Sequence, residues 1–161
     1  MQPSPLSASG MRVQRVNVGP EAVEAVLRFE PGEPLRTTEA PGLAEGIVAA
    51  LPGLRGHRCD NDAGVPFPDE LRDTELAHVV EHAALELMAM AGSPVTLRGE
   101  TSWDFAKDGR GVFHVRLAYD DDLVAIGALR HACELVRSLA RAEAAPDVDA
   151  EALRLRGLRR R

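Results

Sequence analysis

The stretch that most constrains the fold is residues 73–94, DTELAHVVEHAALELMAMAGSP. It predicts one helix, because Asp73 or Thr74 can cap the first free N–H groups and Gly92 with Pro94 supplies a stop. Apolar side chains lie almost all round this helix, and a helix of that kind is mostly buried. The rest of the chain is therefore expected to pack around it.

Inside this helix lies an H-x-x-E-H sequence, His78-Val79-Val80-Glu81-His82. Residues four apart lie one above the other on a helix, so both imidazoles project from one face, and Glu81 shares that side. Two imidazoles can hold Zn²⁺ at roughly 2.0–2.1 Å, and a neighbouring carboxylate can take a proton from water. The same pattern is the motif of the inverzincin metallopeptidases.

Two histidines and a glutamate at this spacing also occur by chance on solvated helix faces. The apolar surroundings argue against a solvated face here, because buried histidine and glutamate side chains need partners and a metal is one kind of partner. His57 and Cys59, in the preceding segment, are candidate additional ligands, although residues in such loops usually serve local structure.

Length and composition favour a single globular domain over residues 11–161, preceded by a disordered Pro- and Ser-rich segment, 1–10. The net charge of −6 argues against non-specific nucleic-acid binding. Cys59 and Cys133 lack the spacing of a zinc knuckle and are expected to be free, buried thiols. No stretch approaches the roughly 18 apolar residues of a membrane span, and the N-terminus lacks a secretory signal, so we expect a cytoplasmic protein with no membrane partner.

The remaining pattern predicts strands over 11–18, 95–102 and 111–119, with 21–29 open between a short helix and a strand. Helices are expected over 38–51, over 120–142 with a cap from the run 120–122, and over 148–158. Residues 55–70 are expected to form a loop, and 103–110 a hairpin turn. This order, β-α-α-β-β-α-α, predicts an α+β fold in which helices cover one face of a small, mainly antiparallel sheet.

Several segments resemble the N-terminal domain of cyanophycin synthetases: 41–47 (PGLAEGI), 51–52, Cys59, 78–87 (HVVEHAALEL), 91–92, 100–102, 111–113 and 137–139. In order and spacing they cover roughly residues 40–140. These synthetases build a polymer with an aspartate backbone and arginine attached to its side-chain carboxylates. The resemblance implies a stand-alone version of the domain, because the two ATP-dependent ligase modules of the synthetase do not fit in 161 residues.

In that family the domain binds the polymer and is similar to one half of M16-type metallopeptidases, and some members carry an H-x-x-E-H zinc site. The resemblance implies that His78 and His82 are Zn²⁺ ligands and that Glu81 is the base. It also implies a third, glutamate ligand from a helix after the hairpin, for which Glu151 is the candidate. Asp149, Asp147 and Glu134 are the alternatives.

Two departures from the family pattern bear on substrate identity. The hairpin turn is longer, and Gly99 stands where an arginine usually precedes Glu100. A closed protease chamber would also need another copy of the chain or another protein, so self-association is a candidate partnership.

The resulting hypothesis is a zinc-dependent hydrolase that cuts an amide or isopeptide bond in a peptide or cyanophycin-like polymer. The alternatives are a non-catalytic module that binds such a polymer or a partner synthetase, and a metal-binding protein without turnover.

Overall fold

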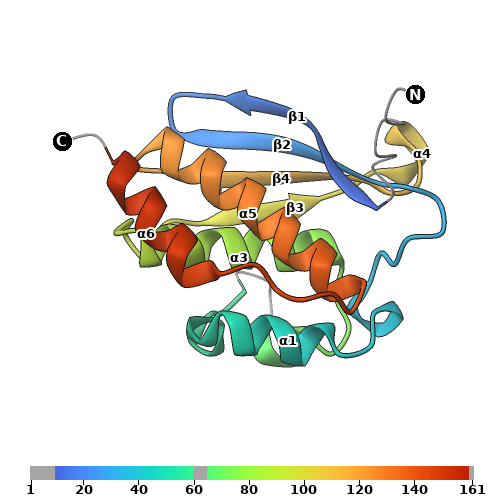
Figure 1. Cartoon of the computed structure of the whole chain (residues 1–161). Helices are drawn as coiled ribbons and strands as arrows, with labels where there is room; N and C mark the ends of the chain where they lie inside the picture. Colours follow the sequence, from blue (N-terminus) through green and yellow to red (C-terminus); the bar gives the residue numbers. More distant parts are fainter. Residues whose placement is uncertain (1–9, 60–64, 160–161) are drawn as a thin grey trace, which may run out of the picture.

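The computed structural model describes residues 10–59 and 65–159, and these form two layers (Figure 1). One layer is a four-stranded antiparallel sheet in the order β1-β2-β4-β3, and helices cover one of its faces. The predicted fold class is confirmed. The expected disordered segment falls on residues 1–9 and Gly10, of which only Gly10 lies within the described residues. No helix in the described ranges is long and apolar enough to span a membrane.

The sheet is built on two hairpins. The strand β1 (Met11–Val18) pairs with β2 (Ala22–Phe29), and β3 (Gly99–Ser102) pairs with β4 (Val112–Ala118). The segment left open between helix and strand is therefore strand β2, which joins the hairpins by pairing with β4. Its buried positions alternate with exposed ones because only one face of the sheet is covered.

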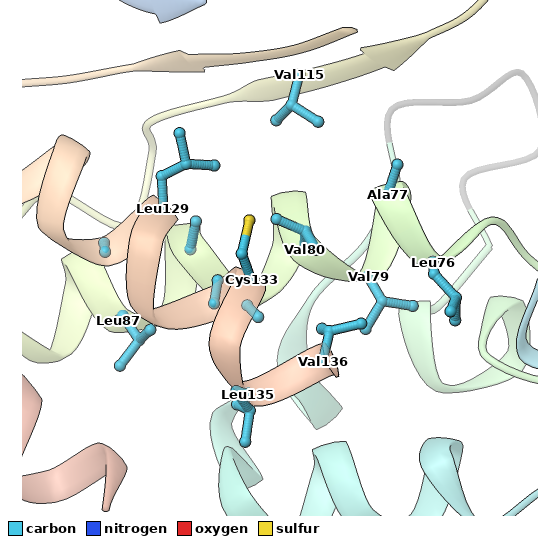
Figure 2. Close-up of a cluster of buried hydrophobic side chains, with 14 of the residues drawn as sticks. Leu76, Ala77, Val79, Val80, Leu87, Val115, Leu129, Cys133, Leu135 and Val136 are labelled. Atoms are coloured by element: carbon cyan, nitrogen blue, oxygen red, sulfur yellow. The ribbon is translucent and has the colours of Figure 1, made fainter. Parts of the chain in front are cut away.

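The central helix α3 (Leu76–Met90) packs on the covered face of the sheet, against β3 and β4. It packs against α5 (Asp122–Ala140), and both helices meet the covered face of the sheet at Val115 (Figure 2). Cys133 is buried with the apolar side chains of this core, and burial raises the pKa of its thiol to about 12. That thiol is therefore expected to be unreactive and to serve in core packing.

The other helices are short or peripheral. They are α1 (Leu43–Ala50), α2 (Phe67–Glu70), α4 (Phe105–Asp108) and α6 (Val148–Leu158), with 3₁₀ turns η1 (Thr37–Glu39) and η2 (Pro52–Gly56). The expected loop over 55–70 thus contains the end of η2 and helix α2. The expected hairpin turn over 103–110 contains α4, whose first turn is capped by Asp104. The helix expected from residue 38 begins only at Leu43, because Gly42 adopts a left-handed conformation with φ 84°.

The buried side of helix α5 contains alanines as well as larger apolar residues. Leu123 is exposed and Ile126 only partly buried, whereas Val124 and Ala128 are fully buried. His131 is buried, and α6 packs against this helix.

Candidate metal centre

Three side chains from two separate segments converge beside α3. His78 and His82 lie on the helix, and Cys59 lies on the segment that follows η2. The Cys59 Sγ is 3.6 Å from the Nε2 of His78 and 3.6 Å from the Nε2 of His82. Among the described residues, these three form the group whose ligand atoms all lie within 4.8 Å of one another.

The distances fit a tetrahedral zinc ion. With a Zn–S bond of roughly 2.3 Å and a Zn–N bond of roughly 2.0–2.1 Å, tetrahedral angles put sulfur and nitrogen ligands about 3.5 Å apart. The donor set, two imidazoles and a thiol, is also one that Zn²⁺ prefers. The residues present therefore fit the metal that the H-x-x-E-H pattern implies.

Burial keeps both imidazoles in the form that a metal binds. It lowers the pKa of His78, partly opposed by the negative charges of Glu70 and Glu75. Burial also lowers the pKa of His82 to about 2, with further lowering from His78 and His57. Both rings are neutral at neutral pH, and neutral imidazole is the ligand form of histidine.

Each of the two histidines is held at its second ring nitrogen. The Thr74 hydroxyl lies 2.9 Å from His78 Nδ1, and that threonine is fixed in turn through backbone contacts with Thr37. The expected helix cap at Asp73 or Thr74 is therefore wrong. The N-cap position is Glu75, without a side-chain capping bond, and the Thr74 hydroxyl serves His78 instead.

The second contact runs from His82 toward η2. The His57 Nδ1 lies 3.0 Å from His82 Nδ1, and the His57 Nε2 lies 2.9 Å from Glu86 Oε2. Phe67 of α2 stacks on His82, with ring centroids 3.9 Å apart and planes inclined by 15°. Together these contacts hold the ring of His82 on both its edge and its face.

Glu81 lies beside the group without being a member of it. Its Oε1 accepts a hydrogen bond of 2.8 Å from the Thr101 hydroxyl, and its Oε2 lies 3.6 Å from His82 Nε2. Gly99 makes room for this carboxylate, because a Cβ at that position would lie 2.7 Å from Glu81 Cγ. One carboxylate oxygen is thus held by β3 and the other lies close to the ligand group.

The group does not include Glu151. On α6, both carboxylate oxygens of Glu151 accept hydrogen bonds from Arg154, at 3.0 and 2.6 Å, and these bonds lower its carboxyl pKa. The alternatives fare no better: Asp147 caps α6, and Asp149 and Glu134 are exposed. The third residue that the structure brings to the histidines is Cys59, which the sequence offered only as an additional candidate.

Sequence reasoning missed Glu86 and Phe67 altogether. Glu86 follows His82 by one helical turn and so lies on the same side of the helix, which is a signal that could have found it. Phe67 carries no such signal, because its place depends on how helix α2 packs over His78 and His82.

The chain matches the model of the cyanophycin synthase-like N-terminal domain over residues 24–141. It is 45% identical over 60 residues to a cyanophycin synthetase of Trichormus variabilis, which covers 37% of this chain and 7% of that protein. It is 33% identical over 104 residues to a cyanophycin synthetase of Crocosphaera subtropica, which covers 64% of this chain and 12% of that protein. The matched region is thus a small part of these relatives. Since the match to the domain model spans well over half of the sequence, the chain belongs to the family of cyanophycin synthase-like N-terminal domains.

Proposed function

We propose that this domain is a zinc-dependent hydrolase of amide or isopeptide bonds, with His78, His82 and Cys59 as ligands and Glu81 as the base. The observation that carries the proposal is the convergence of the three ligand atoms within 4.8 Å with a buried carboxylate beside them. Cys59 takes the place in the ligand set for which Glu151 was predicted. Three protein ligands leave one tetrahedral position open, as in catalytic zinc sites.

The chemistry divides between the ion and the protein. When bound, Zn²⁺ supplies a Lewis acid that polarises a carbonyl and acidifies water. Glu81 takes a proton from the attacking water at Oε2, because Oε1 is already held by Thr101. The water oxygen bonds to the carbonyl carbon, the C–N bond breaks, and Glu81 returns the proton to the leaving nitrogen.

An extended substrate fits the edge of the sheet beside Glu81. Within the described ranges β3 has a paired neighbour on one side only, β4. Arg98 O accepts a bond of 2.9 Å from Ala118 N, so antiparallel alternation turns the backbone groups of Gly99 and Thr101 toward the free edge. These are the residues that contact Glu81, so an added strand would pass close to the base.

The relatives support the choice of substrate class. They are cyanophycin synthetases, so the proposed substrate is a cyanophycin-like polymer of aspartate and arginine, acted on in the cytoplasm. The proposal includes no nucleic-acid or membrane partner, and a second copy of the chain is the proposed means of closing a chamber around the polymer.

The test starts from metal content. Wild type should hold about one zinc per chain, and His78→Ala should hold none. Glu81→Gln should keep the metal and lose hydrolysis of synthetic aspartate–arginine peptides that contain one backbone amide and one isopeptide bond. An unchanged hydrolysis rate in Glu81→Gln would refute the assignment of the base, whereas the absence of zinc in wild type would refute the metal centre.

A second function, polymer binding without cleavage, is favoured by a hollow of about 300 Å³ on the uncovered face of the sheet. Side chains of both charges line it, including Arg15, Arg116, Glu24 and Glu100. An arginine-bearing polymer carries guanidinium and carboxylate groups that suit such a lining. This second function would be favoured over hydrolysis by two results together. Wild type would bind the polymer and release no product, and Arg116→Ala would bind the polymer more weakly.

A further inference from the structure

We propose that Glu86 and His57 are positioning residues that fix which nitrogen of His82 carries the proton; the inference rests on the metal centre proposed above. The path from Glu86 to the ligand group consists of two short contacts. Glu86 Oε2 lies 2.9 Å from His57 Nε2, and His57 Nδ1 lies 3.0 Å from His82 Nδ1. Both outer side chains are mostly buried, with 19% of the His57 side chain and 16% of the Glu86 side chain exposed.

The direction of the hydrogen bonds follows from what each group can do. An ionised carboxylate only accepts, so His57 Nε2–H donates to Glu86. When His57 is neutral, its single ring proton lies on Nε2, which leaves His57 Nδ1 as the acceptor for His82 Nδ1. In that state His82 carries its proton on Nδ1. Its Nε2 keeps the lone pair, and this is the atom that faces Cys59 and Glu81.

The sequence of η2 makes the path possible. A Cβ on Gly53 would lie 1.8 Å from Glu86 Oε1 and 2.5 Å from Glu86 Cδ, so any side chain there would displace the carboxylate. Gly56, at the end of the same 3₁₀ turn, has no atom within 4 Å of its Cβ position. The turn thus offers two glycines, of which one is required by Glu86 and the other is not.

The arrangement matches the usual support of metal-binding histidines. Such rings normally donate their second N–H to a carboxylate, a carbonyl or a water, and loss of that partner typically weakens metal binding by about 10- to 100-fold. Here the carboxylate acts through one intervening imidazole. On the other ligand, Thr74 fills the corresponding place beside His78.

The test compares Gly53→Ala with its matched control Gly56→Ala. In the metal-free protein, ¹⁵N-edited NMR of the imidazole should show the His82 proton on Nδ1 in wild type and in Gly56→Ala. Gly53→Ala should show proton density on Nε2. Titration with Co²⁺ should give equal dissociation constants for wild type and Gly56→Ala, and one about 10- to 100-fold larger for Gly53→Ala.

Two Glu86 variants keep the test decisive if Gly53→Ala does not fold. Glu86→Leu removes the acceptor and should reproduce both changes, whereas Glu86→Gln retains a carbonyl oxygen and should restore most of the affinity. Unchanged tautomer and Co²⁺ affinity in Gly53→Ala or in Glu86→Leu would overturn the inference while leaving the metal centre intact. Failure of wild type to bind Co²⁺ would overturn the metal centre, and the NMR of the metal-free protein would still decide the tautomer.

Discussion

Acid should destabilise the metal-free domain through His82. In the folded chain the pKa of His82 is lowered to about 2 by burial, against an ordinary value of 6.5 in the unfolded chain. Between these two values the unfolded chain binds a proton that the folded chain does not bind. The free energy of unfolding must therefore fall as the pH falls below about 6.5.

The size of the effect follows from the same two values. Protonation of the unfolded state at pH 5.0, 1.5 units below 6.5, favours unfolding by about 2 kcal/mol relative to pH 7.5. His78, whose pKa is also lowered, acts in the same direction. At pH 5.0 most carboxyl groups remain ionised in both states, so the histidines dominate the difference.

The assay is urea unfolding at pH 5.0 and pH 7.5 with a chelator present. Wild type should lose about 2 kcal/mol or more between the two pH values, and His82→Gln should lose about 2 kcal/mol less than wild type does. His114→Gln is the matched control, because it removes a histidine that is half-exposed on β4 and lies outside the ligand group. Equal pH dependence in wild type and His82→Gln would show that the argument from burial is wrong.

Three further experiments test the ligand set, the core and a close backbone contact. Cys59→Ala should weaken Zn²⁺ binding, measured by competition with a chromogenic chelator. Glu151→Gln should not weaken it, because the Glu151 carboxylate pairs with an arginine on its own helix. The reverse result would support Glu151 as the third ligand. Leu129→Ala, at a site 1% exposed, should cost about 2–5 kcal/mol in urea unfolding, and a cost below 1 kcal/mol would contradict its place in the core. Gly111→Ala and Gly32→Ala both place alanine at φ 89°, but only the first puts a Cβ 2.7 Å from a backbone carbonyl oxygen on β2. Gly111→Ala should therefore lower the melting temperature more than Gly32→Ala does. Equal decreases in the two variants would argue against that contact.

The sequence predicted the features that are local and periodic. Helix α3 and the shared face of His78 and His82 depend on spacing along one helix, and the apolar run that buries them is continuous. The strand over 111–119 was likewise predicted from its local pattern, and β4 occupies residues Val112–Ala118.

The features that the sequence did not predict depend on contacts between distant segments. Cys59 reaches the histidines only because η2 and α2 fold back over α3, and it precedes His78 by 19 residues. The burial of His131 on α5 depends on α6, a helix that comes later in the chain and packs against α5. The ion pair of Glu151 with Arg154 was readable from their spacing of three residues, but the implied ligand role gave it a different partner.

Because β3 is pleated, its residues contribute to both faces of the sheet. Successive residues of this strand point to opposite sides, so Glu100 and Ser102 line the hollow while Gly99 and Thr101 contact Glu81. The strand has only four residues and one paired neighbour within the described ranges. A ligand in the hollow that tilted the strand would carry the Thr101 hydroxyl with it and change the hold on the Glu81 carboxylate. Binding of a ligand in the hollow would thus be coupled, through β3, to binding at the candidate metal centre, and the size of the effect would be a coupling free energy.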